Sequence, residues 1–311
     1  MDSVKDLITV IVPVYNRESI VECTLDSIAS QSIRPRLIIV DNNSSDGTLS
    51  VVKRWASAHV SEEFPIEVTG EVTKGAAAAR QKGFGMSATP FVMFFDSDDI
   101  MLPGHIERLA KAISDYPDID IFGWDIAVNE LDGNRRIYPF ADKDIAFRHI
   151  FNGIFSTQRY AVRSKLLTDV GGWNPSVLGW DDYELGVRIL CASPKVKYLY
   201  GEPTVEMKRL EESITGTDYA SSASKWEHAM DICRDTLSRH GNTKWTRWIE
   251  LKTVVLAGLY GREGDRTNAS RLFNQTLDRE PSIMRRTLLT IAFQYTTCGG
   301  RGIHHLLRPF L

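Results

Sequence analysis

Residues 9–48 read TVIVPVYNRESIVECTLDSIASQSIRPRLIIVDNNSSDGT, and this stretch decides the fold class. It begins within the run from Leu7 to Val14, which is continuously apolar and rich in β-branched residues, as in a strand buried on both faces. Apolar residues at helical spacing follow over 19–30, and a second apolar run then ends on Asp41. A strand, a helix and a strand in this order predict an α/β fold with a parallel sheet.

The same alternation continues over the next fifty residues. After the turn residues 42–47, we expect helices over 48–58 and 76–86 and strands over 66–69 and 91–95. Ligands of such sheets bind beyond the carboxyl ends of the strands. Three expected strands end in polar residues, which are Tyr15-Asn16-Arg17, Asp41-Asn42-Asn43 and Asp96-Ser97-Asp98-Asp99. This edge of the sheet is therefore the expected functional site.

Composition narrows the class of protein. Hydrophobic residues make up 43% of the 311 and charged residues 25%, which is typical of a globular chain. The formal net charge of -3 argues against a nucleic-acid partner. The four cysteines form no CxxC pair, as expected of reduced thiols. Because we find no signal peptide and no run of roughly 18 apolar residues, we expect a cytoplasmic protein.

The acidic cluster carries the first chemical hypothesis. Asp96, Asp98 and Asp99 place three carboxylates within four residues, which repel one another unless something offsets their charge. A divalent cation does so, and hard oxygen ligands suit Mg²⁺ or Mn²⁺ bridging two phosphates. The alternative is a solvated acidic turn that caps the next helix.

Four motifs in order resemble those of family 2 glycosyltransferases, which share the Rossmann-like GT-A fold. They are Pro13, Tyr15 and Asn16 after the first strand, VDNNSSDGT at 40–48, GAAAARQKG at 75–83 and FFDSDDIMLP at 94–103. Gln81 stands where the family usually has Asn. The resemblance covers roughly residues 7–215 and implies a mixed, mostly parallel sheet. It also implies inverting transfer of a sugar from a nucleotide-diphosphate sugar, with a UDP-sugar expected, to a hydroxyl acceptor.

The resemblance also implies roles for individual residues. Asp41 would bind the nucleotide base, Asp96 the ribose, and Asp98 the metal, Mg²⁺ or Mn²⁺, on the diphosphate. Arg80 would lie near the base or the diphosphate, where a fixed guanidinium suits either. The implied donor site comprises Pro13, Tyr15, Asn16, Asp41, Arg80, Asp96, Ser97 and Arg209.

The segment GWDDYELGVR at 179–188 resembles the motif that holds the family's general base. Asp182 takes the position of the base, and Asp181 replaces the commoner Glu beside it. Adjacent carboxylates discourage simultaneous ionisation, which raises one pKa toward a working range. The alternative is that the pair only caps a helix. Trp180 and Asp181 are expected to face the acceptor or the sugar, and Trp173 and Trp180 either stack on a sugar ring or are buried aromatic residues.

One departure from the family follows the base. Many members have R-x-H-x-x-S there, whereas this chain has Arg209-Leu210-Glu211-Glu212-Ser213, with Glu211 near the position of the His. Either Glu211 replaces that ligand, or the metal relies on Asp98, phosphates and water. Lys208 and Arg209 are candidates to reach the diphosphate.

Other classes of protein fit less well. Residues 83–88 match G-x-G-x-x-A but precede a strand, so the dinucleotide-binding mechanism of that motif fails. A sugar nucleotidyltransferase would carry a Gly-rich basic loop after the first strand, which VPVYNRES lacks. A non-catalytic nucleotide-sugar-binding or interaction protein is expected to lose Asp98 or Asp182, and both are present. The predicted setting is surface-polysaccharide or glycolipid assembly, by analogy alone.

The remainder of the chain reads as helices without strands. We expect an α/β catalytic domain over 1–220 and a helical region over 221–311. A single tetratricopeptide-like helix pair, joined at Gly264-Asp265, matches at Leu256, Ala257, Tyr260, Gly264, Asp265, Ala269, Phe273 and Pro281. It is either an appendage packed on the catalytic domain or a protein-docking module.

The last thirty residues contain arginines and no acidic residue. Arg285, Arg286, Arg301 and Arg308 are interleaved there with apolar residues. This basic C-terminus is either a peripheral contact with the inner face of the membrane, where a lipid-linked acceptor would lie, or a packed helix with a solvated basic face. The other expected acceptor is a saccharide.

Overall fold

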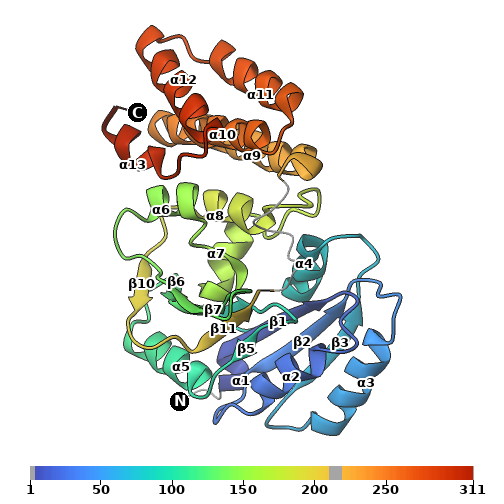
Figure 1. Ribbon diagram of the computed structural model, residues 1–311. Coiled ribbons are helices and arrows are strands. Elements are labelled where there is room, and N and C mark those ends of the chain that lie inside the picture. The colour runs from blue at the N-terminus through green and yellow to red at the C-terminus, as the bar shows by residue number, and fades with distance from the viewer. Residues whose placement is uncertain (1–3, 210–218, 311) are drawn as a thin grey trace.

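The computed structural model describes residues 4–209 and 219–310. A seven-stranded sheet lies at its centre in the order β10-β6-β9-β4-β1-β2-β3 (Figure 1). Its strands are β1 (Ile8–Val14), β2 (Arg36–Asp41), β3 (Ile66–Gly70), β4 (Phe91–Phe94), β6 (Ile121–Trp124), β9 (Tyr160–Arg163) and β10 (Val196–Leu199). Neighbours pair in parallel except at β9, which is antiparallel to both β4 and β6. The expected mixed, mostly parallel sheet is confirmed.

Helices cover both faces of this sheet because β1 has apolar residues on both sides. Val10 and Val12 pack in the core beneath α2 (Val21–Ala29), α3 (Thr48–His59) and α5 (His105–Asp115). Ile11 points the other way, toward α4 (Ala76–Met86), α7 (Ser164–Asp169) and α8 (Asp181–Cys191). Successive side chains of a strand alternate between faces, so a continuously apolar strand can face two cores. The short helix α1 (Val4–Leu7) takes the residue expected to begin the first strand.

Gly83 explains the apparent dinucleotide motif. It lies in α4, which leads into β4, and a Cβ there would lie 2.5 Å from Cγ2 of Ile11 and 3.1 Å from Cγ2 of Val40. A side chain at this position would therefore push α4 away from the sheet. The glycine serves helix–sheet packing and leads into a strand, as the sequence indicated.

A second, four-stranded sheet has the order β5-β11-β7-β8. Its strands are β5 (Ile100–Met101), β7 (Ile126–Asn129), β8 (Arg135–Tyr138) and β11 (Val205–Lys208). The residues after Trp124 form the hairpin of β7 and β8. The Asp132-Gly133 pair at its turn, with Gly133 at φ +80°, was the available signal. Helix α6 (Ile145–Asn152) follows the hairpin.

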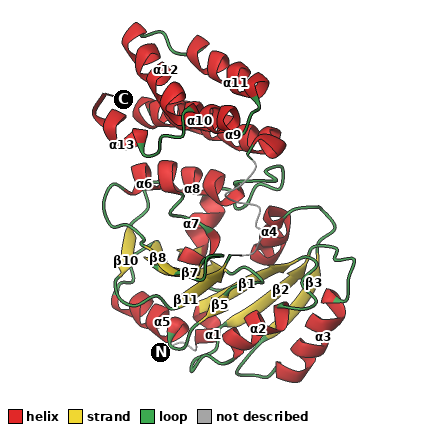
Figure 2. Ribbon diagram, in the orientation of Figure 1, coloured by secondary structure: helices red, strands yellow, loops and turns green. Residues whose placement is uncertain are grey.

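The C-terminal region is entirely helical, as predicted (Figure 2). Side-chain oxygens of Asn242, Asp265 and Ser282 cap three of its helices by accepting from backbone N–H groups three residues on. The helices α10 and α11 lie on either side of Gly264-Asp265, the expected junction of the helix pair. The helices of this region are α9 (Ala223–Arg239), α10 (Thr243–Arg262), α11 (Arg266–Asp278), α12 (Ile283–Thr297) and α13 (Ile303–Leu307). Short 3-10 helices precede α9 and follow α13, namely η2 (Ala220–Ser222) and η3 (Arg308–Phe310), and another, η1 (Thr157–Arg159), precedes β9.

The helical region shares one hydrophobic core with α6 and α8 of the α/β part. Phe147 and Phe151 of α6 and Tyr183 of α8 pack in the same cluster as Trp226 of α9 and Trp248 of α10. Figure 1 shows this stack, with α9 and α10 lying directly over α6 and α8. The helical region therefore packs on the α/β part through a shared core, as in the alternative of a packed appendage. Within the described ranges, no helix has the length and hydropathy needed to cross a bilayer.

Candidate active site

The loops after β1 and β2 fasten to each other at the carboxyl edge of the sheet. Val14 and Asp41 are partners in the parallel register, so the two loops start side by side. Asn16 has a left-handed conformation with φ 51°, which Asn tolerates better than most residues. Its backbone N–H donates to Oγ of Ser44 at 3.1 Å, and its Oδ1 accepts from the N–H of Ser45 at 2.8 Å. The side chain of Asn16 is thus used to join the loops.

Asp41 places a carboxylate oxygen in a buried position at this edge. The residue is 4% exposed, and its Oδ2 accepts from the N–H of Ser44 at 3.1 Å. Its Oδ1 is buried and has no hydrogen-bond partner in the part of the chain that the structure describes. A buried acceptor without a donor is costly, so a ligand N–H would be favoured here. Pro13 is buried beside it, and Tyr15 is 51% exposed.

The acidic cluster follows β4 and combines exposed and buried carboxyl groups. The side chain of Asp96 is 30% exposed and that of Asp98 25%, whereas Ser97 and Asp99 are buried. Burial and the charges of Asp96 and Asp98 raise the pKa of Asp99 well above its usual range. Burial and Asp96 also raise the pKa of Asp98, against the opposing effect of Arg17. The loop therefore concentrates carboxyl groups that oppose one another's ionisation.

Arg17 supplies a positive charge beside Asp98. Its Nη2 lies 3.5 Å from Oδ2 of Asp98, which is a long ion pair, and both side chains are partly exposed. In the described part of the chain, no three His, Cys, Asp or Glu side chains gather as a complete metal site. Mg²⁺ is usually held by one or two carboxylates, with substrate phosphates and water completing its shell. The oxygen chemistry and exposure of Asp98 fit that arrangement.

Arg80 joins the acidic cluster to the predicted base loop. Its guanidinium donates to Oδ1 of Asp96 at 2.8 Å and to Oδ2 of Asp181 at 2.7 Å, and Arg80 is 6% exposed. The two carboxylates hold the pKa of Arg80 above its ordinary value despite burial. The guanidinium also lies 4.8 Å from the ring centroid of Trp173. In this structure Arg80 organises the site by bridging two acidic segments that lie far apart in the sequence.

Asp182 lies in the first turn of α8, next to Asp181. Burial and the charge of Asp181 raise the pKa of Asp182 to about 7, partly opposed by Arg80. Its Oδ1 accepts from the adjacent N–H of Tyr183 at 2.7 Å. The N-cap position belongs to Trp180, whose side chain makes no capping hydrogen bond. Neither aspartate is the N-cap residue, so capping by itself does not account for the pair.

The two tryptophans near this loop have different surroundings. Trp173 is 2% exposed and packs edge-on against Phe94, beneath Arg80, so it is one of the buried aromatic residues that the sequence left as an alternative. Trp180 is partly buried, and its ring lies 5.1 Å from that of Trp226 in α9. That Trp180 and Asp181 face an acceptor or a sugar stays a prediction.

Arg209 lies on the side of the smaller sheet. Its Nε is 3.1 Å from Oε2 of Glu130, and its backbone N–H donates to the carbonyl of Asn129. This ion pair holds the guanidinium beside β7 in the present conformation, and its predicted contact with a diphosphate stays a prediction. Glu211 lies outside the described residues.

The geometry and the family motifs agree with comparisons to known proteins. The sequence model of glycosyl transferase family 2 matches residues 9–174, which is more than half of the chain. The chain belongs to glycosyl transferase family 2. It is therefore a glycosyltransferase with the GT-A fold that the motifs implied.

Three known glycosyltransferases are distant relatives of the chain in sequence. A glycosyltransferase of Haemophilus influenzae is 28% identical over 240 residues, which cover 74% of this chain and 76% of that protein. GlyA of Streptococcus pneumoniae is 29% identical over 73% of this chain but only 33% of its own length. An Escherichia coli protein, WfgD, named UDP-Glc:alpha-D-GlcNAc-diphosphoundecaprenol beta-1,3-glucosyltransferase, is 30% identical over 32% of this chain and 38% of its own.

Solved structures extend the fold comparison to the helical region. S. aureus TarS 1-349 superposes with a TM-score of 0.71 over 98% of this chain and 92% of that chain, at 15% identity. A further TarS structure is a complex with UDP-GlcNAc, with a TM-score of 0.62 at 18% identity over 97% of this chain and 92% of that one. The Pyrobaculum calidifontis mannosyltransferase PcManGT, in complex with GDP-Man and Mn²⁺, gives 0.52 at 18% identity over 94% and 86%.

Several residues that the motifs did not single out for this family 2 site contribute to it. Arg17 pairs with Asp98, as described above. Asn42 uses its whole side-chain amide, donating to the carbonyls of Glu71 and Thr73 and accepting from the N–H of Gly75. Its position directly after the β2 aspartate was the available signal.

Tyr160, the first residue of β9, was also missed. It is 1% exposed, and its hydroxyl has no hydrogen-bond partner in the described ranges. Burial and the charge of Asp182 raise its pKa. An antiparallel strand inserted into a parallel sheet gives no periodic signal of its own, so sequence reasoning could not place Tyr160 near the base.

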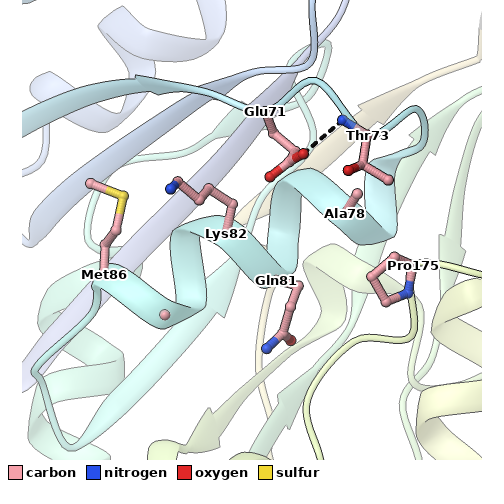
Figure 3. A pocket seen from close by; sticks show the side chains of 8 residues that line it. Glu71, Thr73, Ala78, Gln81, Lys82, Met86 and Pro175 are labelled. Carbon is pink, nitrogen blue, oxygen red and sulfur yellow. Dashed lines mark hydrogen bonds between the residues drawn. The ribbon is translucent and has the colours of Figure 1, made fainter.

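A cavity of about 330 Å³ lies on the outer side of α4 (Figure 3). Gln81, Lys82 and Met86 line it from the helix, together with Glu71 and Thr73 of the preceding loop. Residues one, two and six places from Arg80 point to a different side of a helix than Arg80 does. The cavity is therefore separate from the acidic groups that Arg80 joins.

Proposed function

We propose that this glycosyltransferase moves a sugar from a UDP-sugar to a hydroxyl acceptor, with inversion at the anomeric carbon. The observation that carries the proposal is the bridge from Asp96 through Arg80 to Asp181, because it brings the donor-side cluster and the base loop to one place. The UDP-GlcNAc complex of TarS and the UDP-Glc donor in the name of WfgD support the choice of nucleotide.

In the proposed reaction Asp182 is the general base. The acceptor oxygen forms a bond to the anomeric carbon as the bond from that carbon to the diphosphate breaks, and the hydroxyl proton passes to the carboxylate of Asp182. A single displacement of this kind inverts the anomeric centre. A pKa raised to about 7 makes the Asp182 carboxylate a stronger proton acceptor than an ordinary carboxylate, while part of the group stays unprotonated at neutral pH.

On the donor side, the free Oδ1 of Asp41 would accept a hydrogen bond from the base, with Pro13 and Tyr15 beside it. Asp98 would hold Mg²⁺ or Mn²⁺, and such an ion supplies charge stabilisation for the departing diphosphate. Arg17, next to Asp98, would add a positive charge on the same side. Asn16 and Ser97 complete the proposed donor site through the loops they hold, and Arg209 would join it by leaving Glu130.

The acceptor is proposed to be a saccharide or a lipid-linked saccharide, as the name of WfgD describes for that protein. The C-terminal helices support contact with the cytoplasmic face of a membrane. Met284, Ile291 and Leu306 are exposed there. Arg285 and Arg308 pair with Glu280 and Asp144, while no ion pair of Arg286 or Arg301 appears in the described residues. Exposed apolar and cationic side chains together suit an anionic lipid surface.

A screen of donor hydrolysis over UDP- and GDP-sugars, with and without Mn²⁺, tests the reaction. The expected result is turnover of a UDP-sugar that EDTA abolishes. Turnover restricted to GDP-sugars would overturn the nucleotide assignment, and binding of no donor would favour a platform protein. For the membrane contact, sedimentation with phosphatidylglycerol vesicles should exceed that with phosphatidylcholine vesicles, and Ile291→Asp should abolish the difference.

A further inference from the structure

The loop that carries the base has a strained residue directly before it. Trp180 is the N-cap of α8 and has φ 56° and ψ 34°, the left-handed conformation. For a bulky residue such as Trp this conformation is unfavourable, and it persists only where the surrounding structure enforces it. Asp181 and Asp182 follow directly in the chain, so the orientation of Trp180 sets the start of the helix that presents them.

The groups that enclose Trp180 come largely from the helical C-terminal region. Its ring lies 5.1 Å from that of Trp226 in α9 and 6.4 Å from that of Tyr219. Nζ of Lys252 in α10 lies 5.6 Å from the ring centroid and donates to the carbonyl of Phe151. From the α/β part, Tyr183 lies 5.7 Å away. The side chain that precedes the acidic pair is thus held between α8 and two helices that are remote in sequence.

Gly179 shows how closely the backbone of this loop approaches α9. A Cβ at this position would lie 2.6 Å from Cζ3 of Trp226 and 3.3 Å from Cβ of Lys225. Its φ does not lie in the left-handed region, so space and not conformation requires the glycine. The loop is therefore fitted against α9 at two successive residues.

We propose that the helical C-terminal region positions the base: Trp226 and Lys252 hold Trp180 in its left-handed conformation and thereby orient Asp181 toward Arg80 and Asp182 toward the acceptor. Trp226 and Lys252 are positioning residues that touch no reacting atom. The proposal rests on the proposed function, because it takes Asp182 as the base. It gives the C-terminal helices a role in the reaction beyond covering apolar surface.

The test compares Trp226→Ala with Trp248→Ala in the full-length protein. Both residues are buried in the same core, but Trp248 packs on Phe147 and has no ring contact with Trp180 among the described residues. Trp226→Ala should lower kcat per folded molecule by about 100-fold, the cost of a small misplacement of a reacting group. The dissociation constant of the UDP-sugar, measured by calorimetry, should stay within about twofold because donor contacts are distant.

Two further readouts separate positioning from general destabilisation. Opening the loop exposes Asp182, so the acid limb of the kcat/KM profile should move to lower pH in Trp226→Ala and stay in place in Trp248→Ala. Trp226→Phe should recover most of kcat because it keeps an aromatic face against Trp180. If Trp226→Ala does not fold, Gly179→Ala replaces it, since its methyl group meets Trp226 without removing any core side chain.

Equal loss of kcat in the Trp226 and Trp248 variants, or unchanged kcat in Trp226→Ala or Gly179→Ala, would overturn the positioning role. An Asp182→Asn variant measured in parallel tests the proposed base separately from its positioning by the C-terminal helices. If Asp182→Asn keeps full activity, the proposed base is wrong. If it is inactive while both loop variants are fully active, the base stands and the inference alone fails.

Discussion

The two acidic segments of the site are supported in different ways. The Asp96–Asp99 cluster contacts loops of the first hundred residues, where Asn16 bonds to Ser44 and Ser45 and Arg17 pairs with Asp98. The Asp181-Asp182 pair instead follows a loop that packs on α9 and α10. The proposed donor side is thus held by contacts within the first hundred residues, and the proposed base side depends on the C-terminal helices.

This difference matches the distribution of motifs. The family motifs lie mostly within the first hundred residues, where neighbouring loops must fit one another and the proposed donor. The support of the base loop is ordinary apolar packing, which many sequences satisfy. Arg80 joins the two acidic segments. Variants at Arg80 and at either segment therefore show whether a change in one segment alters catalysis, donor binding or stability through the other.

The largest effect should come from the base itself. Asp182→Asn removes the proton acceptor while keeping the shape of the side chain, so kcat should fall by about 10²–10⁴-fold. Donor affinity should change little, since the donor side holds its own contacts. Steady-state transfer rates and calorimetric donor binding check this, and loss of donor binding would show that the two sides are not separable.

Asp98→Asn should impair the proposed donor side and make activity depend on the Mn²⁺ concentration. It weakens the oxygen ligand proposed for Mg²⁺ or Mn²⁺, so activity should fall by about 10²-fold and recover in part at raised Mn²⁺. The Mn²⁺ concentration that gives half of the maximal rate is the measurement. Asp169→Asn, at an exposed carboxylate paired with Lys165 on α7, is the matched control and should leave that concentration unchanged.

Arg80→Met tests the junction between the sides. It leaves the carboxylates of Asp96 and Asp181 without their shared cation in a largely buried place, which should lower the free energy of unfolding by about 3 kcal/mol. Urea denaturation measures this. Lys165→Met breaks an exposed pair and should cost less than about 0.5 kcal/mol. Equal effects would mean that Arg80 is not the junction that the geometry indicates.

The smallest effect concerns pH. A base must be unprotonated to act, so kcat/KM should rise with pH through a midpoint near the Asp182 pKa of about 7 and level off above it. Asp181→Asn removes a neighbouring negative charge that raises this pKa, so the midpoint should move to lower pH. A midpoint unchanged in Asp181→Asn would argue that a group other than Asp182 titrates.

Much of the α/β half could be predicted from the sequence because its strands are buried on both faces. The apolar run before Tyr15 and the helix over 76–86 appear as expected, since continuous apolar strands and turn residues leave few alternatives. The helix pair at Gly264-Asp265 was also recognisable, because a left-handed glycine and an N-cap aspartate fix its turn.

Other parts carried no local signal. β9 runs antiparallel between β4 and β6, and its four residues resemble any short apolar stretch. The partners of the candidate site residues were equally hidden, because Arg80 meets Asp181 only through the tertiary fold. The sequence therefore indicated candidate site residues, which stay predictions, but not the contacts that Arg80, Trp180 and Arg209 make.

The bridge made by Arg80 also bears on how the chain is synthesised. Asp181 is 101 residues downstream of Arg80, so at about 5–20 residues per second its carboxylate leaves the ribosome roughly 5–20 s after the arginine does. During that interval the guanidinium has only Asp96 of its two partners. The buried ion pairs of Arg80 thus cannot be completed during translation until α8, which begins at Asp181, has been made.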